Sequence, residues 1–240
     1  ETLNDMLERL EEAFARERAF VSDASHELRT PLSILRAELE LALRDARDVE
    51  GFRSAVTSAA EEADRLAQLA EDLLVIARFD QGQLPVRIQA VRVDEMLDAV
   101  SRRFSGRAAA RDVELVVTAP AGEVAGVDRL RVEQALGNLV DNALRHGSRR
   151  IELAAGVDGD RLELHVRDDG SGFPESFLDS AFERFSRADH ARGPGGAGLG
   201  LAIVAAIASA HHGRAAAVNR PEGGADVWMD LPRRPAGSPD

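Results

Sequence analysis

Apolar residues recur at alternating spacings of three and four over the first third of the chain, which predicts two long amphipathic helices. The first helix is expected over residues 1–44 and the second over 52–79, with a turn at 45–51. The apolar positions that support them are Leu3, Leu7, Leu10, Phe14, Val21, Ala24 and Leu28, then Val56, Ala59, Ala63, Leu66, Leu69, Leu73 and Ile76. An antiparallel hairpin of two such helices cannot cover its own apolar stripe. Two hairpins that form a four-helix bundle can, so we expect a dimer.

The pattern changes after Gln81-Gly82-Gln83-Leu84-Pro85, which interrupts the helical periodicity and indicates a linker. Helices and strands are then expected to alternate. The expected helices are 94–110, 128–146 and 198–211, and the expected strands are 113–118, 149–155, 161–167, 214–219 and 225–231. Val157-Asp158-Gly159-Asp160 is typical of a hairpin turn. The predicted fold class is therefore α+β, with a helical hairpin followed by an α/β sandwich.

Composition narrows the possible partners and chemistry. The formal charge of −12 argues against nucleic acid or an anionic membrane as the main partner, because phosphate groups would be repelled. The absence of cysteine excludes disulfides and thiol chemistry. The apolar run 199–210 is shorter than the roughly 20 apolar residues of a membrane span and indicates a core helix. All 30 basic residues are arginine, which hints at a bacterial source.

The first candidate site is the heptapeptide His26-Glu27-Leu28-Arg29-Thr30-Pro31-Leu32. At about 100° per residue, the imidazole of His26 falls opposite the apolar stripe, and Thr30 lies one turn further on the same side. A helix that buries its stripe would therefore expose His26 to water. A proline such as Pro31 is unfavourable in the interior of an ordinary helix, so we expect a bend there. Alone, such a histidine is most simply interpreted as an inert surface residue.

A second constellation lies between residues 138 and 201. It contains two asparagines one helical turn apart and a strand that ends in Asp-x-Gly-x-Gly. A Phe-x-x-Phe pair and a glycine-rich segment before an apolar helix follow. These segments are Asn138-Leu139-Val140-Asp141-Asn142-Ala143-Leu144-Arg145-His146, Val166-Arg167-Asp168-Asp169-Gly170-Ser171-Gly172-Phe173, Phe182-Glu183-Arg184-Phe185 and Gly195-Gly196-Ala197-Gly198-Leu199-Gly200-Leu201.

The order of these five motifs resembles the boxes of bacterial sensor histidine kinases over residues 15–232. It is similar, more distantly, to the ATP-binding fold of DNA gyrase, heat-shock chaperone ATPases and MutL. The resemblance implies a dimerisation and histidine phosphotransfer domain followed, after a linker, by a catalytic ATP-binding domain. The dimerisation and phosphotransfer domain would span 15–81, the linker 82–90 and the catalytic domain 91–232. Two short segments would flank them, the end of a HAMP-like linker helix at 1–14 and a disordered tail at 233–240.

The resemblance also implies roles for individual residues. His26 would accept the phosphoryl group, Glu27 would hold the tautomer or take the proton, and Thr30 would orient water for dephosphorylation of the partner. Asp168 would accept a hydrogen bond from the adenine amine. Mg²⁺ would be held by Asn142 and Asn138, the phosphates would contact Arg145, and adenine would contact His146. The remaining nucleotide-binding positions would be Gly170, Gly172, Gly196, Gly198, Leu199, Gly200 and Leu201.

Other residues are expected to be structural. Residues 189–196 would form a lid over ATP, and Phe182 and Phe185 would pack at its base. The remaining histidines show no metal-ligand spacing with carboxylates and are interpreted as structural or surface groups: His165, His190, His211 and His212.

The resulting hypothesis is the cytoplasmic transmitter of a dimeric bacterial inner-membrane sensor, attached to the membrane only through segments missing from this chain. It would consume ATP with Mg²⁺, phosphorylate His26 and pass the group to a response-regulator receiver domain, with phosphatase activity toward it. A gyrase- or chaperone-type ATPase is a rival, but those enzymes carry a basic glutamate where this chain has Asn138. A catalytically inactive dimeric scaffold is the second rival, and the intact motifs argue against it.

Overall fold

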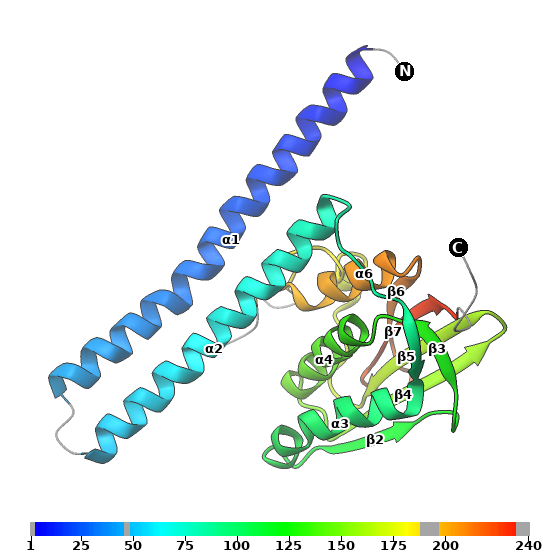
Figure 1. Cartoon of the computed structure of the whole chain (residues 1–240). Helices are drawn as coiled ribbons and strands as arrows, with labels where there is room; N and C mark the ends of the chain where they lie inside the picture. Colours follow the sequence, from blue (N-terminus) through cyan, green and yellow to red (C-terminus); the bar gives the residue numbers. More distant parts are fainter. Residues whose placement is uncertain (1–2, 46–48, 188–196, 234–240) are drawn as a thin grey trace. The chain divides into compact units, whose positions relative to one another are not determined.

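The computed structural model describes residues 3–45, 49–187 and 197–233. The chain divides into two compact units, residues 1–74 and 75–240. The first contains α1 (Leu3–Asp45) and most of α2 (Val49–Asp80), which run in opposite directions (Figure 1). The predicted helical hairpin is thus confirmed.

Within the first unit, α1 continues through Pro31, so the predicted bend does not end the helix. Few apolar side chains of this unit are buried. Ala42 on α1 and Ala59 on α2 are 7% and 6% exposed, whereas Val21 and Leu32 are 57% and 58% exposed. Contiguous exposed apolar surface of this kind favours association with another surface. None of the helices among the described residues combines the length and apolarity that a membrane crossing needs.

The second unit is built on a five-stranded sheet of order β2-β4-β5-β7-β6, in which only the β2–β4 pair is parallel. Helices α3, α4 and α6 pack on it (Figure 1). These elements are β2 (Glu114–Thr118), β4 (Arg150–Asp158), β5 (Arg161–Asp168), β6 (Arg214–Asn219), β7 (Ala225–Pro232), α3 (Val93–Ala109), α4 (Arg129–Arg145) and α6 (Gly200–Ala210). The predicted α/β sandwich is confirmed.

The core follows from the alternation along the strands. On β5 the side chains of Leu162, Leu164 and Val166 are buried, and the residues between them are polar. The sheet therefore has an apolar face under the helices and a polar opposite face.

Three short elements were not predicted from the sequence. The strands β1 (Gln89–Arg92) and β3 (Val124–Val127) form a separate antiparallel pair, and α5 (Glu175–Leu178) is a single turn. Four residues are too few to display a period. At the C-terminus, the backbone N–H of Arg233 donates to the carbonyl of Asp160 over 2.7 Å, and the rest of the predicted tail lies outside the described residues.

A buried histidine ties the start of α4 to the end of α6. His211 is 5% exposed; its Nδ1 lies 2.8 Å from the Ile207 carbonyl, and its Nε2 accepts the backbone N–H of Asp128 over 3.0 Å. Since a carbonyl only accepts, Nδ1 carries the proton and the ring is neutral. The carboxylate of Asp128 in turn caps α4 by accepting the N–H of Arg131. Burial lowers the pKa of His211 below its usual range. The interpretation of His211 as structural agrees with this arrangement.

We predict that the second unit loses stability as the pH falls below about 6.5, the ordinary histidine value. The unfolded chain binds the proton first because the folded pKa of His211 is lowered. This one group can add a slope of up to about 1.4 kcal/mol per pH unit. Urea unfolding between pH 5.5 and 7.5, followed by fluorescence of the single tryptophan, measures the slope. His211→Asn should reduce it strongly, whereas replacement of the exposed His212 by Asn should reduce it only slightly, because the charge of His212 is the smallest of the causes that lower the pKa of His211. Equal slopes in parent and His211→Asn would contradict the prediction.

Candidate functional site

His26 is exposed on α1, as predicted. Its Nδ1 lies 2.9 Å from the carbonyl oxygen of Ser22, so Nδ1 is the donor, and in the neutral ring Nε2 carries the free lone pair. The hydroxyl of Thr30 lies 3.5 Å from the carbonyl of His26, the outer limit of a hydrogen bond. Glu27 is half-buried. The ring is therefore oriented by the backbone one turn earlier, a contact that was not predicted from the sequence.

Asp168 ends β5 and is 8% exposed. Its Oδ1 accepts the backbone N–H of Gly170 over 2.8 Å, and the backbone N–H of Ala225 also bonds to the carboxyl group. Burial raises the pKa of Asp168, and these hydrogen bonds oppose the rise. A buried carboxylate held by donors on its protein side is suited to accept one more bond from a ligand.

A pocket opens at Asp168. It brings together four residues predicted for the nucleotide site, Asn142, His146, Asp168 and Gly172, and its walls include an aromatic ring and small side chains. The full lining is Asn142, Ala143, His146, Asp168, Gly172, Phe173 and Ala225. A pocket that combines apolar side chains with one carboxylate suits a flat heterocycle that carries an amino group.

The asparagine motif also meets the second glycine motif. The side-chain amide of Asn138, on α4, donates to the carbonyl of Gly200 at the start of α6 over 3.4 Å. A Cβ on Gly200 would meet only the Cβ of Asn138, at an ordinary 3.8 Å, so protein packing alone does not demand glycine there. Leu199 is buried in the core, and Leu201 is half-buried. Amide oxygens on α4 could hold a hard cation.

Two glycines are required by the protein itself. Gly172 and Gly198 have φ of 70° and 69°, a region that favours glycine. A Cβ would lie 2.7 Å from Oδ1 of Asn219 in the first case and 2.7 Å from the carbonyl carbon of Phe185 in the second. A Cβ on Gly170 would similarly lie 2.8 Å from the carbonyl oxygen of His146.

Some predicted residues are not brought into this pocket. Gly196 and the predicted lid at 189–196 lie outside the described residues, as does His190. Arg145 is exposed and pairs with Asp141 over 3.4 Å, away from the lining residues. Within the described ranges, no three histidine or acidic side chains gather where they could hold a metal ion.

Two residues at the turn between β6 and β7 support the site and were not predicted from the sequence. The side chain of Asn219 accepts the N–H of Phe173 over 2.7 Å and donates to its carbonyl over 2.8 Å. A guanidinium nitrogen of Arg220 donates to the carbonyl of Asp168 over 3.1 Å. These side chains hold the Asp-x-Gly-x-Gly loop. Asn219 is one of only four asparagines, which was the one available signal.

Known protein families match both the segment that contains His26 and the segment that contains the asparagine and glycine motifs. Residues 16–82 match the family model of the His Kinase A (phospho-acceptor) domain. Residues 127–235 match that of the histidine kinase-, DNA gyrase B-, and HSP90-like ATPases.

Individual relatives extend the similarity along the chain. The sensor protein IrlS of Burkholderia pseudomallei is 35% identical over 97% of this chain and 51% of its own length. The chain thus spans about half the length of the curated relatives it matches. The histidine kinase AdeS of Acinetobacter baumannii aligns with a TM-score of 0.71 and 25% identity over 88% of this chain and 98% of that chain. The histidine kinase ThkA, solved in complex with the response regulator TrrA, shares the fold at 20% identity, with a TM-score of 0.66 over 96% of this chain and 64% of that chain.

We predict that Asp168→Asn weakens adenine-nucleotide binding by about tenfold or more: the single amide oxygen is retained by the Gly170 N–H, so an NH2 donor faces the adenine amine and neither donor is paired. The melting temperature of the unliganded protein should stay the same or rise, because the raised pKa of Asp168 means that its charged form is disfavoured by burial at neutral pH. Calorimetric titration with ADP and a thermal melt measure the two effects.

The neighbouring Asp169 provides the matched control. It is exposed, and its Oδ1 accepts the N–H groups of Arg149 and Arg150 over 2.7 and 2.9 Å. Asp169→Asn should lower the melting temperature and leave the affinity for ADP within about twofold. Unchanged ADP affinity in Asp168→Asn would exclude Asp168 from the site.

Proposed function

Because the chain belongs to the sensor histidine kinase family, we propose that it transfers the γ-phosphoryl group of ATP to its own His26 and then to an aspartate of a response-regulator receiver domain. The observation that carries this proposal is the state of the His26 ring: it is exposed, and the Ser22 carbonyl fixes its proton on Nδ1. This leaves Nε2 with the lone pair that a nucleophile needs.

The chemistry follows from that tautomer. Nε2 attacks the γ-phosphorus, an N–P bond forms, and the bond between phosphorus and the bridging oxygen breaks to release ADP. The ring then carries an extra positive charge until Nδ1 loses its proton. The Ser22 carbonyl cannot take a proton, so we assign this step to Glu27, after Nδ1 leaves the Ser22 bond. In the second step Glu27 returns the proton to Nδ1, the receiver carboxylate attacks phosphorus, and the N–P bond breaks to leave neutral imidazole and an acyl phosphate on the receiver.

The nucleotide would lie in the pocket at Asp168. Asp168 would accept from the adenine amine, with His146 beside the base. The glycine-rich segment before α6 offers backbone N–H groups and a helix N-terminus to the phosphates. Arg145 would contact the phosphates after leaving Asp141. Asn142 and Asn138 would hold Mg²⁺, which neutralises phosphate charge when bound.

Asn138 favours a kinase over an ATPase. Its side-chain amide donates to Gly200, and a carboxamide cannot act as a general base toward water. Bound ATP is therefore preserved until a better nucleophile arrives. The lack of a general base at position 138 therefore argues against an ATPase of the gyrase or chaperone type. The pocket formed by the predicted nucleotide residues argues against an inactive scaffold.

The proposed assembly has two protein partners. A second copy of the chain would cover the apolar side chains that α1 and α2 leave exposed, within a phosphotransfer domain at 15–81. A receiver domain would dock at the exposed face that carries His26 and Thr30; the histidine kinase ThkA, which shares the fold, has been solved in complex with a response regulator. The ATP-binding domain would occupy 91–232. By analogy with the sensor relatives, we place this portion in the cytoplasm of a membrane-anchored protein.

We predict that His26→Gln abolishes phosphoryl labelling, because it removes the attacking nitrogen, while the affinity for ATP stays within about twofold. Incubation with γ-labelled ATP followed by acid and base treatment detects the acid-labile, base-stable phosphoramidate. The exposed His212, replaced by Gln, is the matched control and should label like the parent. Label that persists in His26→Gln would identify a different acceptor.

We predict that Thr30→Ala keeps self-phosphorylation but slows dephosphorylation of the receiver by about tenfold, as loss of a positioning group does. The Thr30 hydroxyl is only weakly engaged with the His26 carbonyl and so is available to orient water. Decay of a pre-phosphorylated receiver, with ADP present, measures the rate.

Ser33 lies three residues further along α1 and provides the control, because its hydroxyl is bonded to the Arg29 carbonyl over 2.8 Å. Ser33→Ala should match the parent rate. Equal decay rates for Thr30→Ala and the parent would leave Thr30 without a role in the phosphatase reaction.

A further inference from the structure

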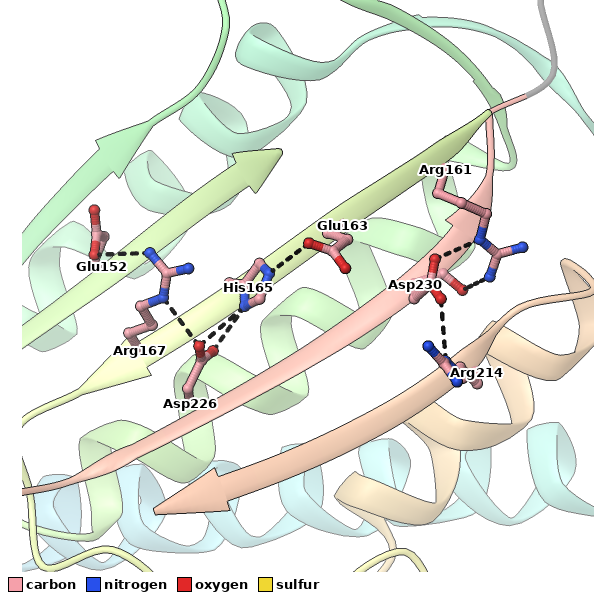
Figure 2. Close-up of polar contacts among 8 residues, drawn as sticks. All are labelled: Glu152, Arg161, Glu163, His165, Arg167, Arg214, Asp226 and Asp230. Atoms are coloured by element: carbon pink, nitrogen blue, oxygen red, sulfur yellow. Dashed lines mark hydrogen bonds and ion pairs between the residues drawn. The ribbon is translucent and has the colours of Figure 1, made fainter. Parts of the chain in front are cut away.

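The face of the sheet opposite the helices carries a connected set of charged side chains (Figure 2). At its centre Asp226, on β7, bonds two residues of β5. Its carboxylate lies 2.9 Å from Nδ1 of His165, and its Oδ2 lies 3.1 Å from Nε of Arg167. We call these three residues the Asp226 cluster. Glu163 and Glu152 extend it through contacts of 3.5 Å to His165 and 3.6 Å to Arg167.

The Asp226 cluster is sheltered from water, unlike an ordinary surface ion pair. The side chains of Asp226 and His165 are 17% and 13% exposed, and Trp228 stacks on the His165 ring with 5.5 Å between ring centres. Burial favours the neutral acid, yet the bonds from His165 and Arg167 outweigh it and lower the pKa of Asp226. A sheltered, charge-assisted pair of this kind fixes strand position more firmly than an exposed pair does.

The cluster lies directly behind the nucleotide carboxylate. Arg167 and Asp226 are opposite each other in the β5–β7 register. The next residue of β5 is Asp168, and the residue before Asp226 is Ala225, whose N–H donates to the Asp168 carboxyl group. Gly224 packs so closely on the Asp168 carbonyl that a Cβ there would overlap it. Any shift of this end of β7 would therefore displace a donor of Asp168.

We propose that Asp226, held by His165 and Arg167, is a positioning residue for recognition of the adenine base. It fixes the end of β7 from the far face of the sheet, so that the Ala225 N–H holds the Asp168 carboxylate in the orientation that accepts the adenine amine. The proposal rests on the nucleotide site proposed above. A carboxylate that is preorganised by its surroundings binds more tightly than one that must be ordered by the ligand.

The same strand supplies a matched control. Asp230 lies four residues along β7, on the same face, and bonds Arg161 over 2.6 Å and Arg214 over 3.1 Å (Figure 2). It has the same chemistry as Asp226 and similar neighbours, but it lies at the end of the strand away from Asp168. Asp230→Ala therefore reports what loss of a charged cluster does to the sheet, without loss of support for Asp168.

The experiment measures ADP and IDP binding by calorimetric titration, using the whole chain. IDP carries a carbonyl where ADP carries the amine that Asp168 would recognise, so the ratio of the two affinities isolates this one interaction. Asp226→Ala should lower the preference for ADP by about five- to tenfold, the scale expected when the support of a binding group is removed. Asp226→Asn, which keeps an acceptor oxygen, should lose less. Asp230→Ala should keep the parent preference within about twofold.

Thermal melts of all variants separate positioning from stability, because Asp230→Ala is expected to lower the melting temperature at least as much as Asp226→Ala. A parent-like ADP preference in Asp226→Ala, or an equal loss in Asp230→Ala, overturns the positioning role. Asp168→Asn is measured alongside. If its ADP preference equals that of the parent, the nucleotide-site assignment fails; if the preference collapses there but not in Asp226→Ala, the positioning role alone fails.

Discussion

The register between β5 and β7 is the constraint on which the second unit depends. Leu164 faces Met229 in the apolar core, and His165 faces Trp228 on the opposite side. Because side chains alternate between the two faces, a slip of β7 by one residue would turn its charged positions into the core. The same slip would separate Asp168 from the Ala225 N–H. Core packing and site geometry are thus specified by one set of backbone pairings.

The pocket illustrates a conflict between stability and binding. Burial makes the charged form of Asp168 unfavourable, as its raised pKa shows. Yet only the charged carboxylate accepts hydrogen bonds without also donating one. The protein supplies backbone N–H donors from Gly170 and Ala225, which reduce the penalty without blocking the side that faces the pocket. The glycines around the carboxylate are needed for this arrangement, because the backbone must come close enough to donate.

Periodicity predicted most of the elements because tertiary packing agrees with local pattern. The helix expected at 128–146 is α4 at Arg129–Arg145, and the strand expected at 214–219 is β6. What it could not predict were contacts between residues far apart in sequence. His165 was interpreted as structural or surface for want of nearby carboxylate spacing, but its partner Asp226 is 61 residues away. The role of Asn219 depends likewise on a loop 46 residues earlier. The motifs located the candidate pocket, whereas the residues that support it became visible only through strand register.

The two chemical groups of the proposed reaction need opposite surroundings, which explains why they lie on different parts of the chain. A nucleophile that must meet both a nucleotide and a receiver aspartate has to be exposed, and His26 is held only by the Ser22 carbonyl of its own helix. A carboxylate that must discriminate one base has to be sheltered, because water would compete for its hydrogen bonds. One rigid pocket could not satisfy both demands. A histidine that is oriented in the resting state by its own helix backbone needs no tertiary support, so it can face different partners in turn.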